Sequence, residues 1–314
     1  MRISIVVPTY KRISDLERCL KAIDGLKLQP HQVIIVCRDI DQETQAFLVV
    51  WKELKKAYKK ETKIVTLPGV IHAMKEGLKL SEGDVTAFID DDAAPRPEWL
   101  QSLARTYSTP DIGGVGGRDV IHNTTTEMLP QKRVGQLTWY GRVIGNHHLG
   151  SGEAREVDIL KGVNMSFRTH LIEFPDYSKG EGAQVHFEVY LCLRIKKMRF
   201  KLIYDPNIIV DHYPAKRFDI DQRNKVVPLA ITNASFNQTV ALLTCAPTHK
   251  VIFRFLYTAM IGDRSTPGLA RLALAVLLSE ENVMKSYIPA LKGQWKAVGF
   301  YLKHLFSKST ALKS

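Results

Sequence analysis

The stretch "GDVTAFIDDDAAPRPEWL", residues 83–100, decides the fold of the first half of the chain. A strand-like run over 85–89 ends directly in three consecutive aspartates, Asp90, Asp91 and Asp92, and a helical pattern begins again near Pro97. Three adjacent carboxylates repel one another unless positive charge offsets them. Mg²⁺ or Mn²⁺ can do this, and when held by one or two carboxylates such an ion usually takes phosphate oxygens as further ligands. The stretch therefore predicts a metal and diphosphate site at a strand end, with an exposed acidic turn before the next helix as the alternative.

Strand and helix patterns alternate around this stretch. Strands are expected at 3–8, 33–36, 63–67 and 85–89, and helices over 16–23, 46–58, 71–80 and 97–107. Ser14 is the expected N-cap of the first helix. Continuous apolar strands alternating with helices predict an α/β fold, with a mostly parallel central sheet and helices on both faces. Such sheets bind ligands beyond the carboxyl ends of their strands, so the polar clusters at 8–12, 38–41 and 90–92 should converge on one crevice.

The rest of the chain is less regular and becomes helical after 214. We expect a glycine-punctuated strand at 113–120, a loop-rich insertion over 121–156, a helix over 185–198 and two short strands within 200–214. The 314 residues, 45% of them hydrophobic and 24% charged, are ordinary for a globular protein with a full core. Four scattered cysteines indicate a reducing compartment. Neither a signal peptide nor an apolar run of about 18 residues is apparent, so a cytoplasmic location without a spanning helix is expected.

Four segments resemble family 2 glycosyltransferases of the GT-A fold, in that family's order. They are "SIVVPTYKR" (4–12), the aspartate stretch 83–100, "GVNMSFR" (162–168) and "FEVYLCLRIKKMRFKLIYDP" (187–206). The resemblance implies a GT-A domain over 1–215, with its nucleotide-sugar half at about 1–120 and its acceptor half at about 121–215, followed by a basic helical region over 216–314. It also implies an inverting transfer of a sugar from a nucleotide-diphosphate donor to an acceptor hydroxyl, with Mn²⁺ or Mg²⁺ as cofactor.

The donor side of the expected site draws on several loops. The resemblance gives the metal to Asp90 and Asp92, and adds His212 as a ligand of the metal or the diphosphate; the alternative for His212 is a structural role. The residues expected near the nucleotide and donor sugar are Pro8, Thr9, Tyr10, Arg12 and Asp91, with solvated surface charge as the alternative for Arg12. For the edge of the base we expect Asp39, or Asp41 in its place, and the alternative is a simple turn former.

The acceptor side rests on a departure from the family pattern. The family places two acids seven and six residues before a helical arginine, and counting back from Arg194 gives Phe187 and Glu188. Glu188 is therefore the expected general base, with an ordinary acid at a helix N-terminus as the alternative. Asn164, Gln184 and His186 are expected to lie on the acceptor side.

The last third of the chain carries most of the positive charge. Residues 215–314 hold 14 Lys+Arg and 5 Asp+Glu, a net charge of +9 out of +12 for the whole chain. At about 100° per residue, one arc of a helix over 284–306 collects Tyr287, Leu291, Trp295, Val298, Leu302, Leu305 and Phe306. A neighbouring arc collects Lys285, Lys292, Lys296 and Lys303. This pattern predicts a helix at an anionic membrane surface, with a helix docked on the domain as the alternative.

A peripheral enzyme at the inner face of the cytoplasmic membrane would account for both halves, with a glycan or lipid-linked acceptor in cell-surface polysaccharide or glycolipid assembly. Nucleic-acid binding is not expected, because the charge accompanies apolar helices and no helix-turn-helix, RRM or zinc-finger pattern occurs. A nucleotidyltransferase should carry a glycine-rich phosphate loop after its first strand, where this chain has "PTYKR". An impaired transferase serving as a scaffold is a further alternative, because Phe187 replaces an acid.

Overall fold

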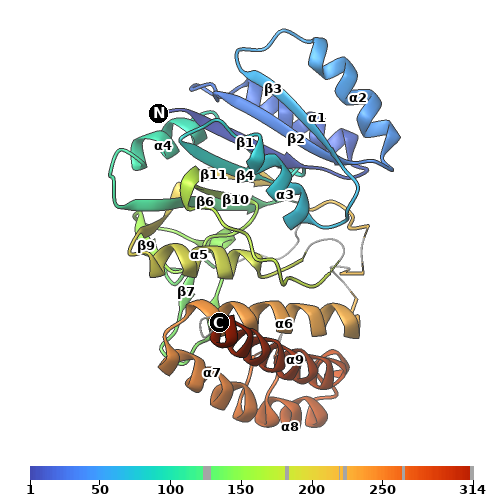
Figure 1. Cartoon of the computed structure of the whole chain (residues 1–314), viewed down its shortest axis with the longest axis vertical. Coiled ribbons are helices and arrows are strands. Elements are labelled where there is room, and N and C mark those ends of the chain that lie inside the picture. Colours follow the sequence, from blue (N-terminus) through green and yellow to red (C-terminus); the bar gives the residue numbers. More distant parts are fainter. Residues whose placement is uncertain (123–128, 181–183, 219, 222–224, 264–265, 312–314) are drawn as a thin grey trace. The chain divides into compact units, whose positions relative to one another are not determined.

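The computed structural model describes residues 1–122, 129–180, 184–218, 220–221, 225–263 and 266–311, and for 306–311 it describes the backbone alone. The chain forms two compact units, whose elements are labelled in Figure 1. The sheet unit comprises Met1–Gln136, Ile144–Phe174 and Arg194–Lys216. The helical unit comprises Leu137–Val143, Pro175–Leu193 and Arg217–Ser314.

The sheet unit is built on a large mixed sheet. Its described strands are β1 (Ile3–Pro8), β2 (Gln32–Arg38), β3 (Lys59–Val65), β4 (Val85–Ile89), β5 (Ala93–Pro95), β6 (Ile112–Ile121), β9 (Arg155–Val157), β10 (Asn164–Arg168) and β11 (Lys201–His212). They are arranged in the order β3-β2-β1-β4-β10-β6-β11-β5, with β9 beside β11. β3, β2, β1 and β4 run parallel and β11 is parallel to β6, whereas β10 is antiparallel to both its neighbours. The predicted α/β class with a mostly parallel central sheet is confirmed.

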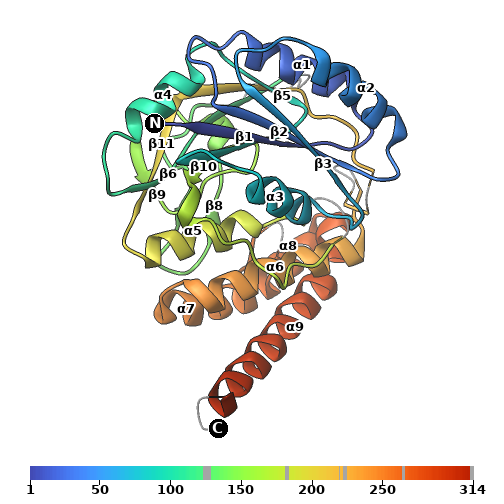
Figure 2. The same cartoon turned by 45° about the horizontal axis from the view of Figure 1, so that its top comes forward.

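Helices cover both faces of the parallel strands (Figure 2). Those of the sheet unit's first half are α1 (Ile13–Asp24), α2 (Gln42–Glu53), α3 (Val70–Lys79) and α4 (Trp99–Thr106). Side chains alternate along β1, so Ile5 and Val7 join one core with α1, α2 and α4, whereas Val6 faces α3. Gly77 of α3 allows this second contact, because a Cβ there would lie 2.5 Å from Cγ1 of Val6.

Short elements connect the larger ones. They are the strands β7 (Gln136–Leu137) and β8 (Val143–Ile144), the 3₁₀ turns η1 (His147–Leu149) and η2 (Thr169–Leu171), and the helix α5 (Phe187–Lys197). The structure corrects two sequence-based details. Ser14 does not cap the first helix, since α1 begins at Ile13 with Arg12 at the N-cap position and no side-chain cap. The stretch 200–214 forms one strand, β11, because its pairing with β6 continues across a register shift between Asp205 and Ile209.

The helical unit contains α6 (Pro228–Cys245), α7 (Thr248–Met260), α8 (Leu269–Leu277) and α9 (Glu281–Ala311). α9 lies along α6 and meets it through small residues, including Ala290, Gly293 and Ala297. The apolar arc expected on this helix is a different face: its exposed members are Leu291, Trp295, Leu302 and Leu305. The side chain of Phe306 lies outside the described residues. One face of α9 therefore docks on the chain's own helix while another presents apolar side chains to solvent.

Candidate metal and nucleotide site

The three aspartates follow β4 and are tied to the end of β11. β5 pairs antiparallel with β11, with Ala93 opposite His212. The backbone N–H of Tyr213 donates to the carbonyl of Asp92 at 2.8 Å, and the N–H of Ala215 donates to Oδ2 of Asp92 at 2.9 Å. The structure thus brings the predicted residues Asp92 and His212 together, although 120 positions separate them in the sequence.

Asp91 points into the protein and anchors the loop after β1. Its carboxylate accepts hydrogen bonds from Oγ1 of Thr9 at 2.8 Å and from Nη1 of Arg12 at 2.9 Å. Burial raises the pKa of Asp91 to about 7, although the Arg12 charge opposes that rise. Arg12 also donates to the carbonyl of Lys216 through Nη2 at 2.8 Å. The loop after β1, the aspartates and the segment after β11 are therefore held together by one guanidinium.

Asp92 belongs to a chain of charged side chains. Nε2 of His212 lies 3.3 Å from Oδ1 of Asp92, and Nδ1 of His212 lies 3.4 Å from Oδ2 of Asp119. Nζ of Lys161 lies 2.5 Å from the same oxygen of Asp119. Burial opposes the charge on His212, but Asp119 and Asp92 together raise its pKa to about 9. The histidine is thus oriented by one carboxylate toward another, an arrangement common for histidines that bind metals.

Asp119 and Lys161 are functional candidates that sequence reasoning missed. Asp119 is fully buried near the end of β6, opposite Val210 of β11. Lys161 directly precedes the "GVNMSFR" segment. A signal existed for Asp119, since it stands at the carboxyl end of a predicted strand, the position that singled out the other polar clusters. Lys161 gave no such signal, because only the fold brings it to Asp119.

Asp90, Asp92 and His212 fit a divalent metal whose remaining coordination positions are filled by other ligands. Asp90 is partly exposed, and burial together with the charge of Asp92 raises its pKa. Burial works against the charge of Asp92, but His212, the Ala215 N–H and Arg12 hold its pKa below the usual value. In the part of the chain that the structure describes, no three His, Cys, Asp or Glu side chains form a ready-made metal cage. Two carboxylates and an imidazole match an ion such as Mn²⁺, which can take both ligand types and keep positions for phosphate oxygens.

The loop after β2 carries both residues expected to bind the edge of the nucleotide base, Asp39 and Asp41, and they differ in exposure. Asp41 is buried and caps α2, accepting from the N–H of Thr44 at 3.3 Å and from the N–H of Lys11 at 2.6 Å. Asp39 has an exposed side chain at the end of β2, and Nε of Arg38 lies 3.4 Å from its Oδ1. Of the two carboxylates, that of Asp39 remains accessible to a ligand, whereas Asp41 holds the neighbouring loop.

The loop after β1 contains the other predicted nucleotide residues. Pro8 ends β1 and is partly exposed, Thr9 is buried, and Tyr10 is partly exposed. Lys11 follows with a φ of +56°, a left-handed backbone conformation that a non-glycine residue adopts at a cost. Its N–H bond to Asp41 supports this conformation, which turns the chain sharply before α1.

Asn164, a residue expected on the acceptor side, lies where four elements of the sheet unit meet. It is buried, and its Oδ1 accepts from Nε1 of Trp99 at 2.9 Å. Its Nδ2 donates to the carbonyls of Ile208 at 2.9 Å and Arg118 at 3.3 Å. The side-chain amide is thus used in joining β10, β6, β11 and α4.

Glu188 stands in the first turn of α5 and belongs to the helical unit, together with Gln184 and His186. Glu188 is partly exposed, which suits a proton acceptor for a bound ligand. Two residues in the segment before it have a strained backbone, since φ is +43° at Gln184 and +71° at His186. Burial lowers the pKa of His186 to about 4, and the charge of Arg254 adds to this. Backbone strain of this kind is often found at functional sites.

A GT-A glycosyltransferase is the class of protein that this sheet order and carboxylate-bearing edge define. S. aureus TarS 1–349, solved with UDP-GlcNAc, has a TM-score of 0.61 to this structure at 17% identity, over 96% of this chain and 81% of that one. The mannosyltransferase PcManGT from Pyrobaculum calidifontis, solved with GDP-Man and Mn²⁺, has a TM-score of 0.58 at 16% identity, over 96% and 85% of the two chains. These likenesses show the fold.

The chain belongs to the glycosyltransferase like family 2, whose sequence model matches residues 1–226. It is similar to the glucosyl-dolichyl phosphate glucuronosyltransferase of Haloferax volcanii, with 27% identity over 68% of this chain and 69% of that protein. A dolichyl N-acetyl-α-D-glucosaminyl phosphate glucuronosyltransferase-type enzyme of Methanococcus voltae is 25% identical, over 67% of this chain and 66% of its own. The protein is therefore a glycosyltransferase, as its sequence motifs predict.

Proposed function

We propose that the enzyme moves a sugar from a nucleotide diphosphate to an acceptor hydroxyl, with inversion at the anomeric carbon and with Mn²⁺ or Mg²⁺ as cofactor. The observation that carries this proposal is the pairing of Asp92 with His212, at 3.3 Å, where β4 and β11 end. Asp90, Asp92 and His212 would hold the ion and leave its other positions to diphosphate oxygens. When bound, the ion offsets negative charge on the departing diphosphate.

The chain's own residues would position the donor. Arg12 and Lys161 bring positive charge to the aspartates and can share it with phosphate oxygens. Pro8, Thr9 and Tyr10 would line the nucleotide from the loop after β1. Asp39, exposed beyond β2, would accept a hydrogen bond from the edge of the base.

Glu188 would act as the general base. In an inverting transfer, a carboxylate takes the proton of the acceptor hydroxyl while its oxygen attacks the anomeric carbon. A glutamate is one methylene longer than the aspartate common at this position, but it carries the same carboxylate. Gln184 and His186, whose strained backbones precede α5, would shape the acceptor side.

The acceptor in this proposal is a lipid-linked glycan at an anionic membrane. The names of the similar H. volcanii and M. voltae enzymes refer to dolichyl phosphate-linked substrates. Residues 1–215 would form the catalytic domain and 216–314, with their net charge of +9, the region that faces the membrane. Such an enzyme would work at the inner face of the cytoplasmic membrane, in cell-surface polysaccharide or glycolipid assembly.

The first test is a thermal-shift measurement with UDP, GDP, dTDP and CDP, each with Mn²⁺ and each with EDTA. A ligand that binds only the native state raises the melting temperature. We expect one nucleotide to raise it with Mn²⁺ and to lose the effect in EDTA. An equal shift in EDTA would contradict the metal site. No shift at millimolar concentration of any nucleotide would favour a scaffold that has lost donor binding.

The second test separates binding from chemistry. Asp92→Ala should abolish the metal-dependent shift, because it removes a ligand of the ion and the partner of His212. Glu188→Gln should keep that shift while transfer falls by about 10²-fold or more, since it removes only the proton acceptor. Transfer by Glu188→Gln at the wild-type rate would rule out the proposed base.

A further inference from the structure

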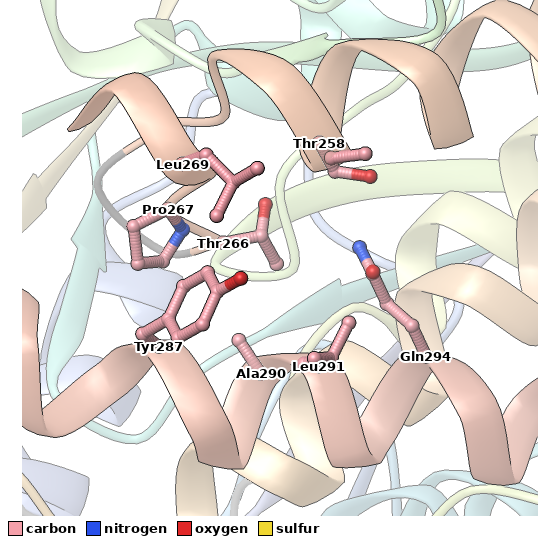
Figure 3. Close-up of a pocket in the computed structure, with 9 residues that line it drawn as sticks. Thr258, Thr266, Pro267, Leu269, Tyr287, Ala290, Leu291 and Gln294 are labelled. Carbon is pink, nitrogen blue, oxygen red and sulfur yellow. The ribbon is translucent and has the colours of Figure 1, made fainter. Parts of the chain in front are cut away.

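A cavity of about 130 Å³ opens in the helical unit between the α7–α8 connection and α9 (Figure 3). Pro267, Leu269, Tyr287, Ala290 and Leu291 supply most of its wall. A dry apolar cavity of ~150 Å³ is large enough to bind a ring the size of benzene. This cavity therefore has room for a short segment of hydrocarbon chain.

The two threonine hydroxyl groups in its wall are already used within the protein. Oγ1 of Thr258 donates to the carbonyl of Arg254 at 2.9 Å. Oγ1 of Thr266 accepts from Nη2 of Arg254 at 2.8 Å and donates to Oδ1 of Asp263 at 2.9 Å. Arg254 itself is buried and pairs with Asp263 at 2.9 Å. This network holds Thr266 in the cavity wall, so that a ligand would meet mainly apolar surface, with the Tyr287 hydroxyl and the Gln294 side chain as further polar groups.

The helices around the cavity expose far more apolar surface than a helix on a soluble core usually does. α8 is "LARLALAVL", yet among its residues only Ala275 is buried. Leu277 is 81% exposed and Leu278, just after the helix, is 60% exposed. A helix that is apolar all round belongs inside a core or in a lipid environment. With nine residues, α8 is too short to span a bilayer and suits its interface.

Neighbouring elements extend this apolar surface. α7 exposes Phe253, Leu256 and Met260, and the ring of Trp139 packs edge-on against Phe253 at 5.2 Å while staying 65% exposed. Trp295 of α9 is 69% exposed. Tryptophan side chains are enriched where proteins meet the membrane–water boundary.

The positive charge on this part of the chain indicates what kind of partner binds its exposed apolar surface. Residues 247–314 contain 10 Lys+Arg and 3 Asp+Glu. Lys292, Lys296 and Lys303 are exposed along α9 beside its apolar stripe. A second copy of the chain would bring like charges together, whereas an anionic leaflet attracts them. In the described residues no helix is long and apolar enough to cross a membrane, which fits binding at the surface.

We propose that the exposed apolar surface of α7, α8, α9 and Trp139 is a lipid-binding face that inserts into an anionic leaflet. The cavity beside Leu269 and Leu291 takes a short segment of one hydrocarbon chain of a lipid in that leaflet. The lipid-linked acceptor is part of the proposed function, and this inference rests on it in that respect. The lipid-binding face would be the surface through which the enzyme reaches that acceptor.

Co-sedimentation with vesicles tests the face. The wild-type protein should bind vesicles of phosphatidylglycerol and phosphatidylcholine and bind at least about tenfold less to phosphatidylcholine alone. The double variant Leu277→Glu, Leu278→Glu should lose at least tenfold in binding, because it places two acids at highly exposed positions. Val49→Glu, at a 66% exposed position on α2 of the sheet unit, is the matched control and should bind as wild type. Equal binding by the double variant and the wild type would overturn the proposal.

Fluorescence quenching by brominated phospholipids reports which part of the chain inserts. Of the four tryptophans, Trp51 and Trp99 are buried in the sheet unit, so quenching would come from Trp139 and Trp295. Quenching that persists in Trp139→Phe would locate Trp295 in the leaflet. Binding without quenching of either residue would show attachment through charge alone, against the proposal.

The cavity has its own test. Ala259 lines it from an exposed position on α7, so Ala259→Phe should fill it without disturbing the core. In native mass spectrometry after release from vesicles, the wild type should retain one phospholipid and the variant none. Retention by both would overturn the cavity as the chain-binding site. Nucleotide thermal shifts measured on the same variants distinguish the proposed function from the proposed lipid-binding face. Vesicle binding without any nucleotide shift would contradict the proposed function and leave the lipid-binding face standing.

Discussion

Asp119 shows how a buried carboxylate can control a site without touching the ligand. Its Oδ2 contacts Nζ of Lys161 at 2.5 Å and lies 3.4 Å from Nδ1 of His212. A carboxylate on the far nitrogen of a histidine fixes the ring and increases its basicity toward a metal. In the proposed site Asp119 would thus be a positioning residue for His212, and it also pairs with Lys161.

Asp119→Asn should weaken Mn²⁺ binding by about 10- to 100-fold, since the amide cannot match the charge that orients His212. Titration of free Mn²⁺ by its EPR signal, without nucleotide, gives the affinity directly. Asp111→Asn removes a surface carboxylate that pairs with Lys201 at 2.7 Å and serves as the control, with an unchanged affinity. The same loss in both variants, or in neither, would argue against a positioning role.

The sequence indicated which residue types gather at the site but not how each is used. Asp90, Asp91 and Asp92 were found because three adjacent acids are unusual after an apolar strand. Their separate orientations, with Asp91 turned in toward Thr9 and Arg12, depend on tertiary hydrogen bonds that no local pattern encodes. The hydrogen bonds of Asn164 to Trp99, Ile208 and Arg118 are likewise tertiary and could not be predicted from the sequence.

At the scale of the elements, two glycines of α9 differ in the space around them. A Cβ at Gly293 would lie 2.4 Å from the carbonyl oxygen of Thr232 and 2.8 Å from Cβ of Ser235, whereas at Gly299 it would meet nothing within 4 Å. Gly293 is therefore required for the close approach of α9 to α6. Gly299 has no such packing reason among the described residues.

We expect Gly293→Ala to destabilise the helical unit by about 1–3 kcal/mol, the usual cost of overpacking. Gly299→Ala, in the same helix, should instead stabilise it by ~0.5–1 kcal/mol because alanine favours helix. Urea unfolding followed by circular dichroism measures both. Equal effects of the two substitutions would mean that α9 does not pack on α6 through Gly293.

Hydrophobic patterns predicted the strands and helices well because those elements are stabilised by the faces they bury. They failed where tertiary pairing overrides a local signal. "YDPN" at 204–207 reads as a turn, yet β11 continues through it, since β6 offers partners on both sides of the register shift. Gly117 of β6 makes room there, because a Cβ would lie 1.8 Å from the carbonyl oxygen of Ile208. On α9 the periodicity found an apolar arc, but small residues on another face make the contact.

For the molecule as a whole, pH should act on stability through His147. The ring is buried, its Nε2 lies 2.9 Å from the carbonyl oxygen of Ile159, and burial lowers its pKa to about 4. Between pH 6.5 and 4, His147 is therefore protonated in the unfolded chain but still neutral in the native protein. The stability due to a neutral His147 is present above pH 6.5 and is lost as the pH falls through this window.

The stability difference between the wild type and His147→Gln isolates this effect, because other groups, such as Asp91, titrate in both proteins. We expect the advantage of the wild type to shrink by up to ~1.4 kcal/mol for each pH unit below 6.5. Urea unfolding at pH 7, 6 and 5 gives the two curves. Parallel curves would show that His147 accepts its proton in the native state at an ordinary pH.

The fold class was predictable from the alternation of apolar strands and helices, and the enzyme class from the resemblance of four segments to family 2 glycosyltransferases. The apolar surface that we propose as a lipid-binding face was predictable only in part. Charge and periodicity pointed to α9, but the exposure of α8 and Trp139 follows from which residues the helical unit leaves outside its core, and a linear pattern does not contain that information.

The burial of the four cysteines makes this enzyme suitable for site-specific labelling. Cys19, Cys37, Cys192 and Cys245 are all buried and none forms a disulfide, and burial raises the pKa of the Cys19 thiol well above its usual range. Maleimide dyes react with accessible thiolates, so the folded protein should stay almost unlabelled. A single cysteine introduced at an exposed position, such as Leu277→Cys, would then carry one fluorophore on an otherwise silent background. The native sequence therefore allows single-molecule imaging to test whether the protein binds a membrane.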